Sequence, residues 1–167
     1  MAYFIIISSV ADKDYQDFLF DLKKISILKK FFSKTPSLKS HKTFQSTSFL
    51  TGAKQQYKDF NESLKELLFG GTIVDNFFWH PFSPAKYHSP SETKKLYADI
   101  EANYNLLSKI SERTDYGEYF ENEINKILTE LKFSVDNDFG LIIMYEKPHD
   151  KARAKKTKYV NLIKADT

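Results

Sequence analysis

Two continuous runs of apolar residues lie near opposite ends of the chain. Residues 3–7 read Tyr-Phe-Ile-Ile-Ile, and residues 140–145 read Gly-Leu-Ile-Ile-Met-Tyr. β-Branched and aromatic side chains favour strands, and a run without polar alternation is typical of a strand covered on both faces. We therefore expect two buried strands, the first ending at Ser8-Ser9, that lie together in a small central sheet.

Between these runs, apolar residues recur at helical spacing and predict several helices. Asp12 can cap the first helix. Its apolar face comprises Tyr15, Phe18, Leu19, Leu22 and Ile25 and can be extended to Leu28 and Phe32. Three later faces comprise Tyr57, Phe60, Leu64, Leu67 and Leu68; Leu96, Ile100, Tyr104, Leu107 and Ile110; and Tyr116, Phe120, Ile124, Ile127, Leu128 and Leu131.

Local signals mark the ends of these elements. Gly70-Gly71 ends one helix, because glycine accepts the left-handed conformation found at helix C-termini. Ser89-Pro90-Ser91-Glu92 begins the next, with a capping box and a proline in the first turn. Ile73-Val74 predicts a short strand, and Asn137-Asp138 predicts the turn before the last strand.

The segment 37–56 carries the weakest pattern, because it is rich in Ser, Thr, Lys and Gln. We expect a short irregular helix from about His41 to Leu50, stopped by Gly52. Serine and threonine compete for backbone hydrogen bonds, so the helix propensity of this segment is poor.

One strand, several helices and a closing strand predict a single α+β domain over residues 1–146, with helices packed around the sheet. The chain has a net charge of +3. Residues 147–167 form a basic tail with a net charge of +5, so residues 1–146 carry a net charge of −2. We interpret the tail as a solvated terminus, in which Tyr159–Ile163 either adds a weak strand or stays mobile.

The composition excludes several classes of protein. The 167 residues include no cysteine, so disulfides and thiolate chemistry are excluded. No run approaches the length of a membrane span or a signal core, and we expect a soluble cytoplasmic protein. Aromatic residues make up 16% of the chain, a density that suits cores and binding surfaces.

The densest aromatic segment lies between turn signals at residues 75–84. It contains Phe77, Phe78, Trp79, His80 and Phe82. Such a segment is too apolar for an ordinary solvated loop. Two readings stay open: a loop folded back to plug the core, or the wall of a pocket or docking surface.

Known catalytic motifs do not occur. There is no P-loop, dinucleotide fingerprint or nucleophile elbow. The four histidines (His41, His80, His88 and His149) show no metal-ligand spacing, and we predict no metal and no cofactor. The carboxylates Glu118, Glu121 and Glu123 stand at the start of a predicted helix, where negative charge is favourable without any catalytic role.

The order of these signals resembles the YfbM-like family, a domain-of-unknown-function family of bacterial and phage proteins. The resemblance covers residues 1–146 and implies a single α+β domain without assigning a reaction. The matching segments are Lys42-Thr43-Phe44, Phe49-Leu50-Thr51-Gly52, Leu68-Phe69-Gly70-Gly71, Pro84 to Glu92 and Leu141 to Tyr145. Phe44 replaces the family tryptophan, and the usual histidine between that position and the threonine is absent, so no role for it is carried over.

The favoured hypothesis is a non-catalytic binding module for a partner protein or small ligand, in toxin immunity or phage–host conflict by analogy. Its site would combine the aromatic segment with Phe44, Thr51, Tyr87 and His88. The alternative is an enzyme acting on a nucleotide or sugar, with His80 or His88 beside a carboxylate. A weaker alternative is nucleic-acid binding by the tail; otherwise we expect neither nucleic acid nor membrane as a partner.

Overall fold

The computed structural model describes residues 4–28, 38–46, 62–74, 85–105, 117–146 and 163–165. Within these ranges the chain forms seven strands and four helices. In chain order they are β1 (Phe4–Ala11), α1 (Asp12–Leu28), β2 (Leu38–Ser40), β3 (Lys42–Ser46), α3 (Glu62–Phe69), β4 (Thr72–Ile73), β5 (Lys86–His88), α4 (Pro90–Ala102), α6 (Gly117–Asp136), β6 (Phe139–Glu146) and β7 (Ile163–Ala165).

The main sheet has five strands in the order β3-β1-β6-β5-β4, and each neighbouring pair is antiparallel. The two apolar runs form its centre, where Ile7 of β1 lies opposite Ile143 of β6. This arrangement confirms the predicted α+β domain and the predicted neighbourhood of the first and last apolar strands.

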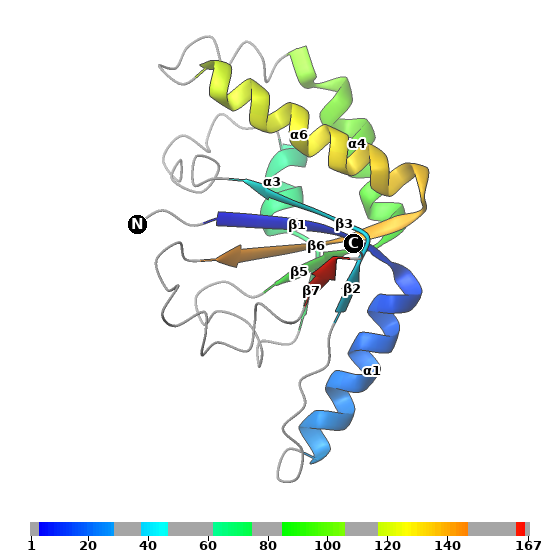
Figure 1. Cartoon of the computed structure of the whole chain (residues 1–167). Coiled ribbons are helices and arrows are strands. Elements are labelled where there is room, and N and C mark those ends of the chain that lie inside the picture. The colour runs from blue at the N-terminus through cyan, green and yellow to red at the C-terminus, as the bar shows by residue number, and fades with distance from the viewer. Residues whose placement is uncertain are drawn as a thin grey trace.

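Helices cover both faces of this sheet (Figure 1). On one face α3, α4 and α6 pack against Ile5, Ile7, Leu141 and Ile143. On the other face Tyr15 and Phe18 of α1, with Leu38 of β2, join a second cluster around Val10 and Ile142. Successive side chains of a strand point to opposite faces, so each central strand contributes apolar side chains to both clusters.

Strand β1 is longer than the sequence predicted, because Ser8 and Ser9 lie inside it instead of ending it. Both serines are fully buried. The hydroxyl of Ser8 is 3.0 Å from that of Thr43 on β3, and Ser9 is bonded to α6 through Glu130 and Ser134. A buried hydroxyl is tolerated in a strand when it is hydrogen-bonded.

The prediction of a helix from about His41 to Leu50 is wrong for the described residues, because residues 42–46 form strand β3. The cause is tertiary pairing. Strand β1 has a free edge opposite β6, and β3 fills it with Phe44 opposite Ile7. In a segment of poor helix propensity, pairing with a neighbouring strand stabilises the chain more than forming an isolated helix would. Residues 47–50 lie outside the described residues.

The predicted helix start at Ser89 and the predicted turns at Gly71 and Asp138 are confirmed. Ser89 caps α4, its side chain accepts from the Glu92 backbone N–H, and Glu92 completes the capping box. Gly71, just after α3, has φ of +79°. Asp138 occupies the left-handed region at φ 55° in the turn between α6 and β6, a conformation that Asn and Asp tolerate best among residues with a side chain.

Strand β7 pairs in parallel with β2, so that Ile163 lies opposite Leu38. This short strand shares only Ile163 with the segment Tyr159–Ile163, for which a weak strand was one of two expectations; residues 159–162 lie outside the described residues. Among the described helices, none is long and apolar enough to cross a membrane.

Replacing Gly71 with alanine tests the turn after α3. A Cβ at Gly71 would lie 2.7 Å from the Tyr87 carbonyl oxygen and 2.9 Å from the His88 ring, at a positive φ. We expect Gly71→Ala to lower the free energy of unfolding by about 1–3 kcal/mol in urea denaturation.

Gly70→Ala is the matched control. A Cβ there would meet only the side chain of Glu66, which is exposed and can move aside. An equal loss of stability in the two variants would contradict the assignment of backbone strain to Gly71.

Candidate functional site

The predicted aromatic segment connects β4 to β5 at one edge of the sheet. We call residues 75–84 the hairpin loop. Its base is held firmly: the N–H of Val74 donates to the carbonyl of Ala85 at 2.9 Å, and both side chains are buried. Six of the predicted site residues lie outside the described residues: Thr51, Phe77, Phe78, Trp79, His80 and Phe82.

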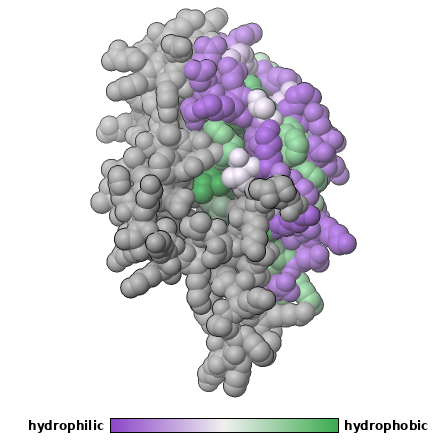
Figure 2. Space-filling view, viewed as in Figure 1, coloured by the Kyte–Doolittle hydropathy of each residue, from purple (hydrophilic) through white to green (hydrophobic). Residues whose placement is uncertain are grey.

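Two large apolar side chains are exposed on α3 and β4, the elements that precede the loop in the chain. Phe69 at the end of α3 is 45% exposed, and Ile73 on β4 is 54% exposed. The third large exposed apolar residue of the described chain is Phe20 on α1, at 58%. In the view of Figure 2, the described surface is mostly hydrophilic, with smaller apolar areas between the polar side chains.

Tyr87 is buried and tied to α1. Its ring stacks on that of Tyr15 with centroids 3.5 Å apart, and its hydroxyl donates to the Asp12 carboxylate at 2.8 Å. Burial, with the hydrogen bond to Asp12, raises the pKa of Tyr87 well above its ordinary value. Burial also raises the pKa of Tyr15 to about 12. The pair is therefore neutral and links β5 to the start of α1.

His88 is likewise buried, and its Nε2 lies 2.9 Å from the carbonyl oxygen of Leu67. A carbonyl only accepts hydrogen bonds, so Nε2 carries the proton. Burial lowers the pKa of His88, although the Leu67 carbonyl opposes this change. His88 is therefore a neutral residue that joins β5 to α3, and its Nε2 is engaged within the fold.

Phe44 does not lie with Tyr87 and His88. It stands on β3 at one edge of the sheet, whereas β5 is separated from β3 by β1 and β6. The ring of Phe44 is half-buried, and Nζ of Lys126 on α6 lies 5.9 Å from its centroid. The described members of the predicted set thus occupy two separate places.

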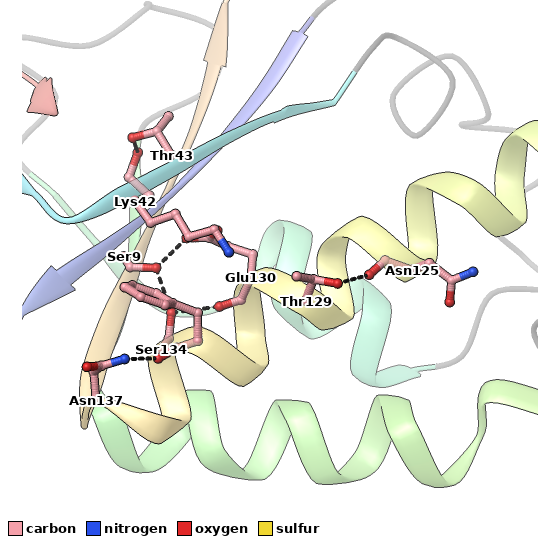
Figure 3. A network of polar contacts seen from close by, with 10 residues as sticks. Ser9, Lys42, Thr43, Asn125, Thr129, Glu130, Ser134 and Asn137 are labelled. Carbon is pink, nitrogen blue, oxygen red and sulfur yellow. Dashed lines mark hydrogen bonds and ion pairs between the residues drawn. The ribbon is translucent and has the colours of Figure 1, made fainter. Parts of the chain in front are cut away.

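The sequence analysis missed a buried polar cluster between β1, β3 and α6 (Figure 3). We call it the Glu130 cluster: Glu130, Ser9, Ser134 and Lys42. The Ser9 hydroxyl donates to Glu130 Oε1 and lies 2.7 Å from the Ser134 hydroxyl. Lys42 Nζ lies 3.6 Å from Glu130 Oε2.

The carboxylate of Glu130 lies in a buried environment. Its side chain is only 1% exposed, and burial raises its pKa, against the opposing effects of Ser9 and Lys42. Ser9 is itself fully buried, so its hydroxyl is closed to a substrate. The cluster holds charge inside the fold and does not present a nucleophile.

One signal in the sequence could have located this cluster. Glu130 stands at helical spacing from Ile127 and Ser134, on the face of α6 that packs on the sheet. A glutamate at such a position is rarely fully buried unless it is paired. The partners of Glu130 could not be inferred from the sequence, because Ser9 was expected at the end of a strand and Lys42 in a helix.

The described residues contain no group of three or more histidine, aspartate or glutamate side chains that could hold a metal ion. Comparisons with protein-family models, curated proteins and solved structures found no match. The resemblance to the YfbM-like family therefore stays a prediction.

Glu130→Gln should remove a pH dependence of stability. Because the pKa of Glu130 in the folded chain lies above its ordinary value of 4.5, the folded chain keeps a proton where the unfolded chain has released it. The stability contribution of Glu130 therefore falls as pH rises from about 4.5 through the folded pKa.

We expect the free energy of unfolding of wild type to decline relative to Glu130→Gln over this range, measured by urea denaturation at several pH values. Glu62→Gln is the control, since the exposed Glu62–Lys65 pair contributes little. A constant difference between wild type and Glu130→Gln at every pH would contradict the assignment.

Proposed function

We propose that this chain is a binding module that engages a protein or small-molecule ligand through the hairpin loop. The observation that carries the proposal is the base of this loop. Val74 and Ala85 are buried and hydrogen-bonded to each other at the sheet edge, so the fold anchors both ends of the most aromatic segment of the chain.

The surroundings of this base also suit a binding surface. Ile73, directly before Val74, and Phe69, at the end of α3, are exposed, although large apolar side chains are usually buried. Interfaces are enriched in aromatic residues, and loops on a rigid scaffold commonly carry binding residues. We therefore assign Ile73 and Phe69 to the proposed binding surface together with the aromatic residues of the loop.

The chemistry of the described residues favours binding over the alternative enzyme hypothesis. His88 was one of its two candidate acid–base residues, and its Nε2 is engaged with Leu67. Proton transfer needs a side chain within hydrogen-bond reach of a substrate, and His88 is buried. The biological settings that we propose, by analogy alone, are toxin immunity and phage–host conflict, with the chain as an inhibitor or ligand sequesterer.

Substitution at the loop tests this function, because Trp79 is the only tryptophan of the chain. We expect Trp79→Ala to weaken binding of a partner captured from the native host by at least about tenfold, since truncation of a tryptophan hot spot costs about 2 kcal/mol or more and a tenfold change corresponds to about 1.4 kcal/mol. Ile73→Asp should weaken it as well. Binding would be measured by calorimetry with the purified partner, and folding by circular dichroism.

Phe20→Ala is the control, since Phe20 is an aromatic residue of α1 whose exposure of 58% is close to the 54% of Ile73. It should leave the affinity unchanged. If folded Trp79→Ala and Ile73→Asp bind the partner as tightly as wild type does, the hairpin loop is not the binding surface.

A further inference from the structure

The Glu130 cluster leaves one carboxylate oxygen directed away from the hydroxyl groups. Oε1 receives the Ser9 hydroxyl, and Ser9 is in turn bonded to Ser134. Oε2 is buried and has no hydrogen bond; its neighbour is the Lys42 ammonium at 3.6 Å, longer than a hydrogen bond. The carboxylate is thus hydrogen-bonded at Oε1, and its buried Oε2 faces the Lys42 ammonium.

An aromatic ring borders the same position. Nζ of Lys42 lies 4.9 Å from the centroid of the Phe133 ring, within the range of a cation–π interaction. Phe133 packs against Phe139 at 6.0 Å between centroids, and Phe139 stacks on His41 at 4.4 Å. The ring is therefore held in place by its neighbours.

We propose that Glu130 and Phe133 form a binding site for a primary alkylammonium group, which Lys42 occupies from within the chain. A buried carboxylate and an aromatic face are the two groups that recognise such a cation. They come from successive turns of α6, whereas the ammonium comes from a different element, the edge strand β3.

The exposures of the partners indicate how the site is reached. Glu130 is 1% exposed, whereas the Lys42 side chain is 40% exposed, so the lysine side chain extends from a partly exposed position to a buried carboxylate. When Lys42 is truncated, a free alkylammonium ion can take the space that its side chain leaves. Filling the site by Lys42 holds β3 on α6, and a competing ammonium would release that contact.

Charged groups of the neighbouring elements are paired with one another and not with Glu130. From the turn before β3, His41 lies 3.3 Å from Asp14 of α1, so these two groups face each other. On α6, Lys126 pairs with Glu123 at 2.8 Å and Lys132 with Asp136 at 3.0 Å. Lys42 is the cation that the structure records next to Glu130.

Chemical rescue tests the proposal. Lys42→Ala deletes three methylene groups and the ammonium, the same group as n-propylammonium. We expect n-propylammonium chloride to raise the Tm of the full-length Lys42→Ala variant by about 2–4 °C more than sodium chloride at equal ionic strength, as ligand binding to the folded state does. Wild type should respond less, because its tethered lysine competes for the site.

Two controls isolate the role of Glu130. The double variant Lys42→Ala/Glu130→Gln should lose the rescue, and n-propanol, which has the same shape without charge, should not rescue Lys42→Ala. Lys132→Ala removes a lysine from an exposed pair on the same helix and should show no rescue either. If Lys42→Ala does not fold, Lys42→Thr retains strand propensity and takes its place.

The proposal is overturned if n-propylammonium shifts the Tm of folded Lys42→Ala or Lys42→Thr no more than sodium chloride does. It is also overturned if the shift is the same with Gln at position 130, because the carboxylate would then not be the receptor.

Discussion

The antiparallel pairing of β1 with β6 is the constraint on which the rest of this structure depends. Both strands carry buried apolar side chains on both faces, so neither can lie at a solvated surface. Ile5, Ile7, Leu141 and Ile143 need a cover on one side, and Val10 and Ile142 need one on the other. Three helices meet the first requirement, and α1 with β2 meets the second. The three-layer arrangement is therefore a consequence of two strands that must be covered on both faces.

Polar groups buried within these layers give the packing its specificity. The serines of β1 could have been replaced by apolar residues without loss of strand propensity, yet each has a defined partner: Ser8 at Thr43, and Ser9 at Glu130 and Ser134. A register shift of one residue would move Ser9 to the opposite face and leave the Glu130 carboxylate without its hydroxyl donor. The same polar contacts that raise the cost of misalignment also connect an edge strand, a central strand and a helix.

Structural features that depend on residues close together in the sequence could be predicted, and features that depend on tertiary contacts could not. The apolar runs, the capping box at Ser89 and the glycine turn at Gly71 are written within a few residues, and the structure confirms them. Strand β3 was mistaken for a helix because its identity depends on a vacant edge of β1, which no window around His41 reveals. The Glu130 cluster was missed for the same reason, since Ser9, Lys42 and Glu130 meet only after three elements have packed. Of the residues predicted to bind a ligand or partner, Tyr87 and His88 are buried on β5. Tyr87 packs against Tyr15, and His88 is hydrogen-bonded to Leu67, so both residues hold the fold together.

The pairing of Ile7 with Ile143 also bears on how the chain is made. Strand β1 is synthesised long before its main partner β6, so the central ladder cannot close until the residues between them have been made. Contacts this distant in sequence slow folding, because the intervening chain must lose conformational entropy before the contacts can stabilise it. During that interval the apolar residues of β1 are available for incorrect pairing. Nascent chains of this protein should therefore depend on chaperone capacity, and slower translation would not by itself give the N-terminal strand a place to fold.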